Sequence, residues 1–203
     1  MDQTILLMKA QLNQSAGVLT DAFADDVMWK GMLPQPEERN RVMPVLWRGV
    51  VAYCLRYGIV STTPDVTGIA AWAKPGNAHA TLWRQVRTGF VLARSVMLMS
   101  KESRDRFMRV MRQIDGMHRE LMPQPHWYLW ALGVDPAHQG QGIGRSLLAP
   151  TLAEAQRTGF PCYLETMTEG NVAFYAKQGF EVIHESEFPE ADFRLWFLHK
   201  PAE

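Results

Sequence analysis

One stretch of the sequence combines a hydrophobic strand pattern with closely spaced glycines. The apolar run Trp127–Val134 leads through Asp135-Pro136 to Gln139-Gly140-Gln141-Gly142-Ile143-Gly144 and then to Arg145. Glycines let the backbone approach a ligand and adopt conformations that a side chain would forbid. The unpaired N–H groups at the start of a following helix attract phosphate oxygens, and the helix dipole strengthens this attraction. The segment therefore predicts the binding of a pyrophosphate.

The spacing of these glycines excludes two common phosphate-binding motifs. A dinucleotide-binding G-x-G-x-x-G motif that starts at Gly140 needs a glycine at position 145, where the sequence has arginine. A P-loop needs a lysine and a hydroxyl residue after its last glycine, and no such lysine follows here. The pattern that fits is Q-x-x-G-x-G over residues 139–144. This is the acetyl-CoA motif of the GNAT superfamily of N-acetyltransferases, which the sequence resembles.

The resemblance continues downstream of the glycines. Glu165-Thr166 precedes the run Asn171-Val172-Ala173-Phe174-Tyr175-Ala176-Lys177-Gln178-Gly179-Phe180, which is similar to the family's N-x-x-[FA]-Y-x-x-x-G-F pattern. Within the superfamily, the puromycin N-acetyltransferase-like subfamily is the most similar, through residues 164–166, 22–25 and Pro150. The match is firm over residues 126–199 and loose over residues 1–125.

The resemblance implies a binding site for acetyl-CoA as co-substrate. The loop and the first turn of the following helix would hold the pyrophosphate, and one strand and the next helix would hold the pantetheine arm. The pyrophosphate residues would be Gln139, Gly140, Gln141, Gly142, Ile143, Gly144, Arg145 and Ser146. In the strand Trp130–Val134, the backbone groups of Leu132 and Val134 are the candidates for the arm, and Asn171 would contact it from the next helix.

Tyr175 matches the tyrosine that lies near the thioester sulfur in many family members. Proton donation from a phenol of pKa about 10 to a thiolate of about 8.5 runs uphill by roughly 2 kcal/mol, so a hydrogen bond to the developing charge is the more reasonable role. The spacing alone would equally suit a core tyrosine packed beside Phe174 and Phe180.

Glu165 is the leading candidate for a general base that deprotonates the acceptor amine. Strand alternation places Tyr163, Glu165 and Met167 on one face. A structural carboxylate bonded to neighbouring backbone is an equal alternative, and Glu169 and His126 are weaker candidates. Residue Cys162 is interpreted as a structural thiol, because no His/Asp partners for a covalent mechanism are recognisable around it.

The expected acceptor is a small or medium-sized primary amine with an apolar body. Its site would be built by the N-terminal half and the turn at residues 184–193. The aromatic, acidic and methionine candidates there are Asp25, Asp26, Trp29, Met32 and Trp72. A protein or peptide amine remains an alternative acceptor, and a non-catalytic CoA-binding module is a third hypothesis.

The elements that must position these residues are of mixed α+β type. Helices are predicted at 11–24, 37–57, 78–121, 142–157 and 171–178, and strands at 59–62, 66–73, 126–134, 162–167, 180–186 and 193–199. Pro150 lies inside the fourth helix, where a kink is expected. The resemblance implies the GNAT fold, a mixed and mostly antiparallel sheet with splayed central strands flanked by helices. We expect one GNAT domain over residues 1–203, with an acceptor-side half (1–125) and an acetyl-CoA-binding half (126–200).

Composition limits the remaining possibilities. Basic and acidic residues balance at 21 each, which argues against a dedicated nucleic-acid binder or a polybasic membrane protein. The chain carries two cysteines, too few to form a metal site alone, and no metal is expected. The apolar run at 5–8 follows Asp2 and is too short for a signal peptide or a membrane span. We therefore expect a soluble, cytoplasmic protein whose partner is a small-molecule amine, without nucleic-acid or membrane partners and with a homodimer left open.

Charge is unevenly distributed despite this balance. Residues 84–119 are mainly basic, and residues 163–192 are mainly acidic. Two solvated faces that offset one another are the simpler interpretation. A negative rim that attracts a cationic substrate is the functional alternative.

Overall fold

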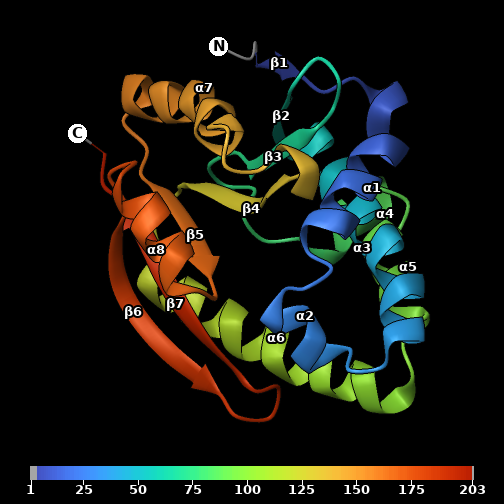
Figure 1. Ribbon diagram of the computed structural model, residues 1–203. Coiled ribbons are helices and arrows are strands. Elements are labelled where there is room, and N and C mark those ends of the chain that lie inside the picture. The colour runs from blue at the N-terminus through green and yellow to red at the C-terminus, as the bar shows by residue number, and fades with distance from the viewer. Residues whose placement is uncertain (1–3, 203) are drawn as a thin grey trace.

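The computed structural model describes residues 4–202, so the two ends of the expected domain, including Asp2, lie outside the described residues. Seven strands form one sheet in the order β1-β2-β3-β4-β5-β7-β6 (Figure 1). The strands are β1 (Ile5–Leu6), β2 (Gly58–Thr62), β3 (Gly68–Ala73), β4 (Trp127–Val134), β5 (Cys162–Thr166), β6 (Glu181–Phe188) and β7 (Phe193–Lys200). Neighbouring strands are antiparallel except for the β4–β5 pair, which is parallel. The predicted mixed, mostly antiparallel sheet is confirmed.

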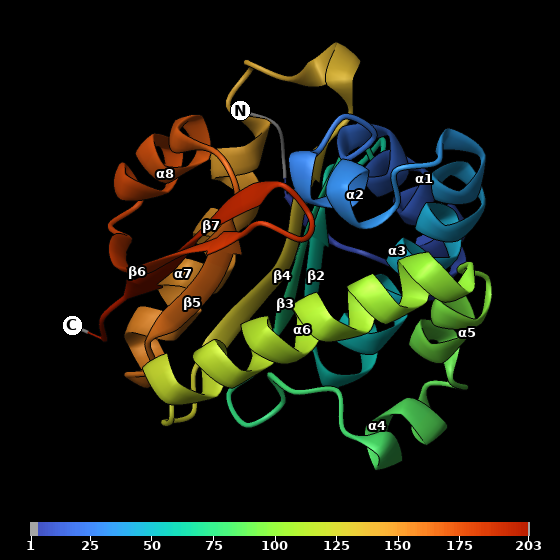
Figure 2. The ribbon, with the colours of Figure 1, turned by 90° about the horizontal axis from the view of Figure 1, so that it is seen from below.

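Helices cover both faces of this sheet. They are α1 (Leu12–Ala22), α2 (Val27–Met32), α3 (Pro36–Tyr57), α4 (Leu82–Arg87), α5 (Val91–Met97), α6 (Lys101–Leu121), α7 (Ile143–Thr158) and α8 (Glu169–Ala176), with short 3-10 turns at Lys9–Gln11 and Pro136–His138. Helices α1 and α3 pack on one face of β3, and α7 packs on β2, β3 and β4. In the view of Figure 2, α6 runs across the sheet on the α1–α3 side. The apolar side chains accordingly form two clusters, one on each face.

The helical region predicted over residues 78–121 consists of three helices, and the first of them begins only at Leu82. Gly89 and Phe90 adopt positive φ angles of 75° and 53°, which end α4 and begin α5. Ser100 then starts α6, because its Oγ accepts a hydrogen bond from the Ser103 amide (3.2 Å). The apolar residues continue across these breaks, and so their pattern did not indicate where one helix ends and the next begins.

Helix α7 runs through Pro150, as the sequence predicted. Proline has no N–H group to donate to the carbonyl four residues earlier, here that of Ser146. The Thr4 hydroxyl donates to this Ser146 carbonyl over 3.1 Å. The N-terminal segment therefore satisfies the acceptor that Pro150 leaves free.

Strands β4 and β5 are paired only at their first residues. Trp127 pairs with Cys162 and Tyr128 with Tyr163, and the pairing ends there although β4 continues to Val134 (Figure 1). The register of β4 against β3 also shifts at Ala71/Trp72, where a β-bulge leaves Trp130 without a partner residue. The expected splaying of the central strands is present, and it leaves the far half of β4 facing away from β5.

The described residues contain no helix that is both long and apolar enough to cross a membrane. Within the same described residues, no group of three or more His, Cys, Asp or Glu side chains is arranged to hold a metal ion.

Candidate active site

The glycine-rich segment forms a loop between β4 and α7. Gly140 and Gly142 adopt φ angles of 76° and 83°, a conformation that strongly favours glycine. A Cβ atom added at either position would meet nothing within 4 Å, so the space above this loop is open. The first helical hydrogen bond joins the Ser146 amide to the Gly142 carbonyl (3.1 Å). The amides of residues 143–145 precede that bond and are available to an anion.

The loop is tied to the end of β4 by its own side chains. Gln139 Nε2 donates to the Val134 carbonyl over 3.0 Å, and Asp135 accepts from the Ala137 amide over 2.9 Å. The Gln139 side chain is therefore used to shape the loop. Helix α8 lies next to the same loop, because a Cβ at Gly144 would contact the Phe174 ring at 3.5 Å. The structure thus brings together the predicted pyrophosphate loop, α8 and the half of β4 that is not paired with β5.

A cavity with a volume of about 760 Å³ is lined by residues of β4 and α8, the two elements that adjoin this loop; the loop residues themselves do not line it. Leu132 of β4, Glu165 of β5, and Asn171 and Tyr175 of α8 line one part of it. It then continues between the helices on the other side. The lining there is aromatic and methionine-rich, with Phe23, Trp29, Trp47, Phe107, Met108 and Met111. A cavity of this size can enclose a drug-sized molecule.

Glu165 is held by Tyr128 at the edge of this cavity. The Tyr128 hydroxyl donates to Glu165 Oε2 over 2.7 Å. The Glu165 side chain is only 10% exposed, and its Oε1 has no hydrogen-bond partner among the described residues. Burial raises the pKa of Glu165 to about 7, against the hydrogen bond from Tyr128, which lowers it. A carboxylate with this pKa is suited to accept a proton near neutral pH.

Three aromatic residues around Glu165 were not predicted as site residues: Tyr128, Tyr163 and His118. The His118 ring stacks on Tyr163 with centroids 4.2 Å apart, and its Nδ1 lies 4.0 Å from Glu165 Oε1. A signal for His118 existed, because it follows Ile114 by four residues on the apolar face of the predicted helix. The two tyrosines gave no separate signal, since aromatic residues are ordinary in strands.

Tyr175 lies on α8 with its ring against Phe174 and Phe180, at centroid distances of 5.1 and 5.7 Å. It is 7% exposed, and burial raises its pKa above the ordinary value. The residue lines the cavity. The structure therefore combines both sequence interpretations, a ring in the core and a position on the cavity wall.

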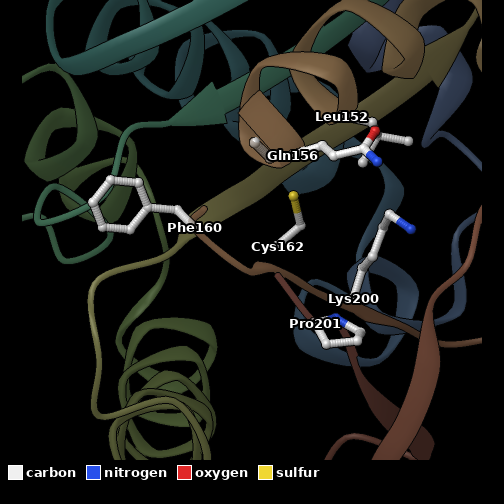
Figure 3. Close-up of a pocket in the computed structure, with 7 residues that line it drawn as sticks. Leu152, Gln156, Phe160, Cys162, Lys200 and Pro201 are labelled. Atoms are coloured by element: carbon white, nitrogen blue, oxygen red, sulfur yellow. The ribbon is translucent and has the colours of Figure 1, made fainter. Parts of the chain in front are cut away.

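Cys162 points to the opposite face of the sheet from Tyr163. It belongs to the apolar cluster under α7, whereas Tyr163 belongs to the other cluster. Figure 3 shows its thiol beside Gln156 and Lys200, in a small pocket of about 10 Å³. Burial raises the pKa of this thiol to about 12. Such a thiol is a poor nucleophile, in agreement with the structural role expected for it.

The candidates for the acceptor side divide into three groups. Asp26 and Trp29 line the cavity, and burial raises the pKa of Asp26 to about 6. Asp25 is exposed and pairs with Lys30 over 2.7 Å. Met32 and Trp72 are fully buried and are absent from the cavity lining, so the structure does not bring them to the site.

The alternative bases lie elsewhere. Glu169 is exposed in the first turn of α8. His126 is 3% exposed, and its Nε2 contacts His118 Nε2 at 2.8 Å. His126 does not line the cavity, so it can act only through its neighbours.

The basic and acidic segments of the chain meet at α6 and the β6–β7 turn. Arg109 Nε and Gln113 Nε2 contact the two oxygens of Glu190 at 3.1 and 3.2 Å. This pairing agrees with the interpretation that the two charged segments offset one another.

A family model matches part of the chain. Residues 106–180 match the model of the acetyltransferase (GNAT) family. That range includes Glu165, Tyr175 and the whole glycine-rich loop.

Solved structures match over the whole chain. An enzyme from Corynebacterium glutamicum ATCC 13032, described as "histone acetyltransferase HPA2 and related acetyltransferase", is 19% identical with a TM-score of 0.72, and the match covers 100% of this chain and 98% of that one. The arylalkylamine N-acetyltransferase 2 of Aedes aegypti is 12% identical with a TM-score of 0.66 and 99% coverage of both chains. The ribosomal-protein-S18-alanine N-acetyltransferase of Escherichia coli is 15% identical with a TM-score of 0.54, with 100% of this chain and 95% of that chain covered. The chain therefore has the GNAT fold, and membership of the GNAT superfamily is supported by the family model over residues 106–180 and by these structures.

Proposed function

We propose that the protein transfers an acetyl group from acetyl-CoA to the primary amine of a small or medium-sized molecule, by direct attack in a ternary complex. One observation supports this most strongly. One cavity is lined by Tyr175, by the half of β4 that is not paired with β5, by the buried carboxyl group of Glu165, and by a mainly apolar set of side chains from the helices. The family model and the similar structures support acetyltransferase activity of the GNAT kind.

The residues present fit acetyl-CoA. The positive-φ glycines and open space at residues 140 and 142 suit a pyrophosphate, which the amides of residues 143–145 would bind. Backbone groups of Leu132 and Val134, in the part of β4 that is not paired with β5, and Asn171 would contact the pantetheine arm. Leu132 and Asn171 line the cavity, whereas the Val134 carbonyl already accepts from Gln139. Acetyl-CoA supplies an acetyl thioester, and every other contribution comes from the protein.

Glu165 accepts a proton from the attacking amine. An alkylammonium of pKa about 10.4 costs roughly 4–5 kcal/mol to deprotonate at neutral pH. A base with a pKa of about 7 instead of 4.5 makes the transfer more favourable by about 3 kcal/mol. The burial that raises the pKa of Glu165 therefore serves this role directly.

Tyr175 donates a hydrogen bond to the sulfur as its negative charge develops. Its pKa is raised by burial, so complete proton transfer to sulfur would be still more unfavourable than for an ordinary phenol. A hydrogen bond made as the charge develops lowers the barrier without that transfer.

The acceptor is proposed to carry an apolar body in the chamber beyond Glu165. The aromatic and methionine lining supports this class, because such surfaces adapt to apolar groups. A similar structure is named for arylalkylamines and another for agmatine, both small amines. We also propose that the chain is most similar to the puromycin N-acetyltransferase-like subfamily, on the sequence likeness of residues 164–166, residues 22–25 and Pro150. Other similar structures are named for histone and ribosomal-protein acceptors, so a protein amine is the competing acceptor.

Release of the free thiol of CoA, measured with a panel of amines, tests the proposal. The panel contains aryl-alkylamines, short alkylamines, polyamines and peptides with a free N-terminus or a lysine. We expect turnover with bulky apolar amines and loss of turnover in the Glu165→Gln variant. Turnover only with peptides would show that the acceptor is a protein or peptide amine. Tight acetyl-CoA binding without turnover of any amine would indicate a non-catalytic module.

A further inference from the structure

Two buried histidines connect Glu165 to a backbone carbonyl. His126 Nδ1 lies 2.7 Å from the Gln124 carbonyl oxygen, and His126 Nε2 lies 2.8 Å from His118 Nε2. His118 Nδ1, on the other side of its ring, lies 4.0 Å from Glu165 Oε1. The three contacts form a line that ends at the carboxylate.

The carbonyl at one end fixes the position of every proton in this line. A carbonyl oxygen can only accept, so His126 Nδ1 carries the hydrogen. A neutral imidazole has one N–H group, so His126 Nε2 accepts, and His118 Nε2 must donate to it. A neutral His118 then has no hydrogen on Nδ1, and that bare nitrogen faces Glu165 Oε1.

Both histidines are held neutral and in place by their surroundings. The side chain of His118 is 3% exposed, and burial lowers its pKa to about 2. Burial also lowers the pKa of His126. Stacking on Tyr163 at 4.2 Å and an edge contact with Tyr128 at 4.6 Å fix the His118 ring.

We propose that His126, acting through His118, keeps Glu165 a strong proton acceptor, because it fixes the His118 tautomer that withholds a hydrogen-bond donor from Glu165 Oε1. The proposal rests on the role of Glu165 as base. In that role the N–H bond of the amine breaks as an O–H bond forms on Glu165, and the proton returns to water after the products leave. His118 and His126 are positioning residues, since neither exchanges a proton with the substrate.

The charge state of Glu165 depends on every group that faces it. Tyr128 donates to Oε2 and favours the carboxylate. The buried Tyr163 hydroxyl lies on the same strand and face as Glu165, and its interaction with the carboxylate also lowers the pKa of Glu165. Asp115, from α6, opposes the carboxylate by its negative charge. His118 Nδ1 faces Oε1 at 4.0 Å, and so its tautomer decides whether Oε1 faces a hydrogen-bond donor or a bare nitrogen on this ring.

The charges around His118 act in the same direction as its burial. His79, whose ring lies 4.9 Å from that of His118, and Arg119 both disfavour a second proton on it. His79 is itself paired with Asp115 at 2.9 Å. The neutral state on which the proton assignment depends is therefore supported from α6 and from the loop before α4.

The pH dependence of kcat/KM distinguishes this role from a merely structural one. In His126→Leu, His118 loses its acceptor and can turn its hydrogen to Nδ1, toward Glu165. We expect the acid limb of the profile to move to lower pH by about one unit, since the new hydrogen bond favours the carboxylate. In His118→Phe, the aromatic ring is kept and no donor faces Oε1, so the limb is expected to stay near its wild-type position.

The matched control is His184→Leu, at an exposed position on β6, which should leave the limb in place. The proposal would be overturned if the acid limb of the kcat/KM profile of His126→Leu stayed in place or moved to higher pH. It would also be overturned if the limb of His118→Phe moved down together with that of His126→Leu.

Nitrogen-15 NMR of the imidazole rings tests the proton assignment without any substrate. We expect a protonated Nε2 and a bare Nδ1 in His118, and the reverse in His126. A hydrogen on His118 Nδ1 in the wild type would overturn the proposal even if the variants lose activity. The carbon-13 titration of the Glu165 carboxyl in wild type and His126→Leu must show the same downward shift. If these resonances behave as expected but no amine is acetylated, the proposed function fails while the assignment of the histidines stands.

Discussion

A 2.7 Å hydrogen bond joins the hydroxyl of Tyr128, the last residue of β4 that is paired with β5, to Oε2 of Glu165, which follows the last paired residue of β5. The bond therefore spans the two strands where they begin to separate. Because it stabilises the carboxylate, it sets a limit on how far burial can raise the pKa of Glu165.

Tyr128→Phe removes this bond, and the pKa of Glu165 should rise above about 7. A hydrogen bond to a charged group contributes about 1.5–3 kcal/mol, so the acid limb of kcat/KM should move up by roughly one to two pH units. A pH profile measured with one amine checks this, and activity should recover at high pH. A uniform loss at every pH would show that Tyr128 has a different role. The direction is opposite to that expected for His126→Leu.

Glu165 should also make the folded protein less stable as the pH rises. Its pKa is raised from 4.5 to about 7 by burial, so between these values the folded state binds more protons than the unfolded state. The free energy of unfolding then falls as pH rises through this window and is lowest above it. Glu165→Gln removes the effect, and the variant should be more stable than the wild type by up to about 3 kcal/mol above pH 7, with little difference near pH 4.5.

Urea denaturation at several pH values measures this difference. Glu169→Gln, which removes an exposed carboxyl group from α8, is the matched control. If Glu165→Gln lowered the free energy of unfolding at every pH, the Glu165 carboxylate would stabilise the fold, and its role would be structural.

The parts of the site that lie close together in the sequence could be predicted from it. The glycine-rich loop and Tyr175 depend on local spacing; Tyr175 lines the cavity, and the loop follows β4, which also lines it. Strand alternation correctly placed Tyr163 and Cys162 on opposite faces. The roles of the glycine-rich loop in binding and of Tyr175 in catalysis stay predictions.

The surroundings of Glu165 could not be predicted in the same way. His118, Tyr128 and Glu165 come from α6, β4 and β5, and only the folded sheet brings them together. Nor did the sequence separate cavity residues from core residues, because a tryptophan such as Trp72 is as apolar as Trp29. Helix α2 was missed because its six residues are too few to show a helical period.

Gly142 should be required for the binding of acetyl-CoA. Its φ angle of 83° would cost an L-residue about 1–2 kcal/mol, although the space beside it is open. Gly142→Ala is therefore expected to displace the loop and to weaken acetyl-CoA binding several-fold or more, as measured by calorimetry. Gly116→Ala is the control, because Gly116 lies in α6 with open space around it and should gain about 0.5–1 kcal/mol of stability. Unchanged affinity in Gly142→Ala would remove the loop from the binding site.

Thr4 and Pro150 should be coupled in stability through the Ser146 carbonyl. Thr4→Val removes the 3.1 Å hydrogen bond to this carbonyl and should cost about 1 kcal/mol. Pro150→Ala restores a backbone N–H that can donate to the same carbonyl. In the Pro150→Ala background, Thr4→Val should therefore cost much less. A double-mutant cycle by chemical denaturation measures this coupling, and equal costs in both backgrounds would show that Thr4 does not replace the missing bond.

Tyr175→Phe should separate binding from turnover. The ring keeps its contacts with Phe174 and Phe180, so the fold and the acetyl-CoA affinity are expected to stay the same. The hydrogen bond to the developing sulfur charge is lost, and a charged hydrogen bond of about 1.5–3 kcal/mol corresponds to roughly a 10- to 100-fold lower kcat. Calorimetric binding and steady-state kinetics on the same preparation check both parts. Unchanged turnover would assign Tyr175 to the core alone. An equal loss of acetyl-CoA affinity would show that its hydroxyl stabilises bound acetyl-CoA as much as it stabilises the transition state.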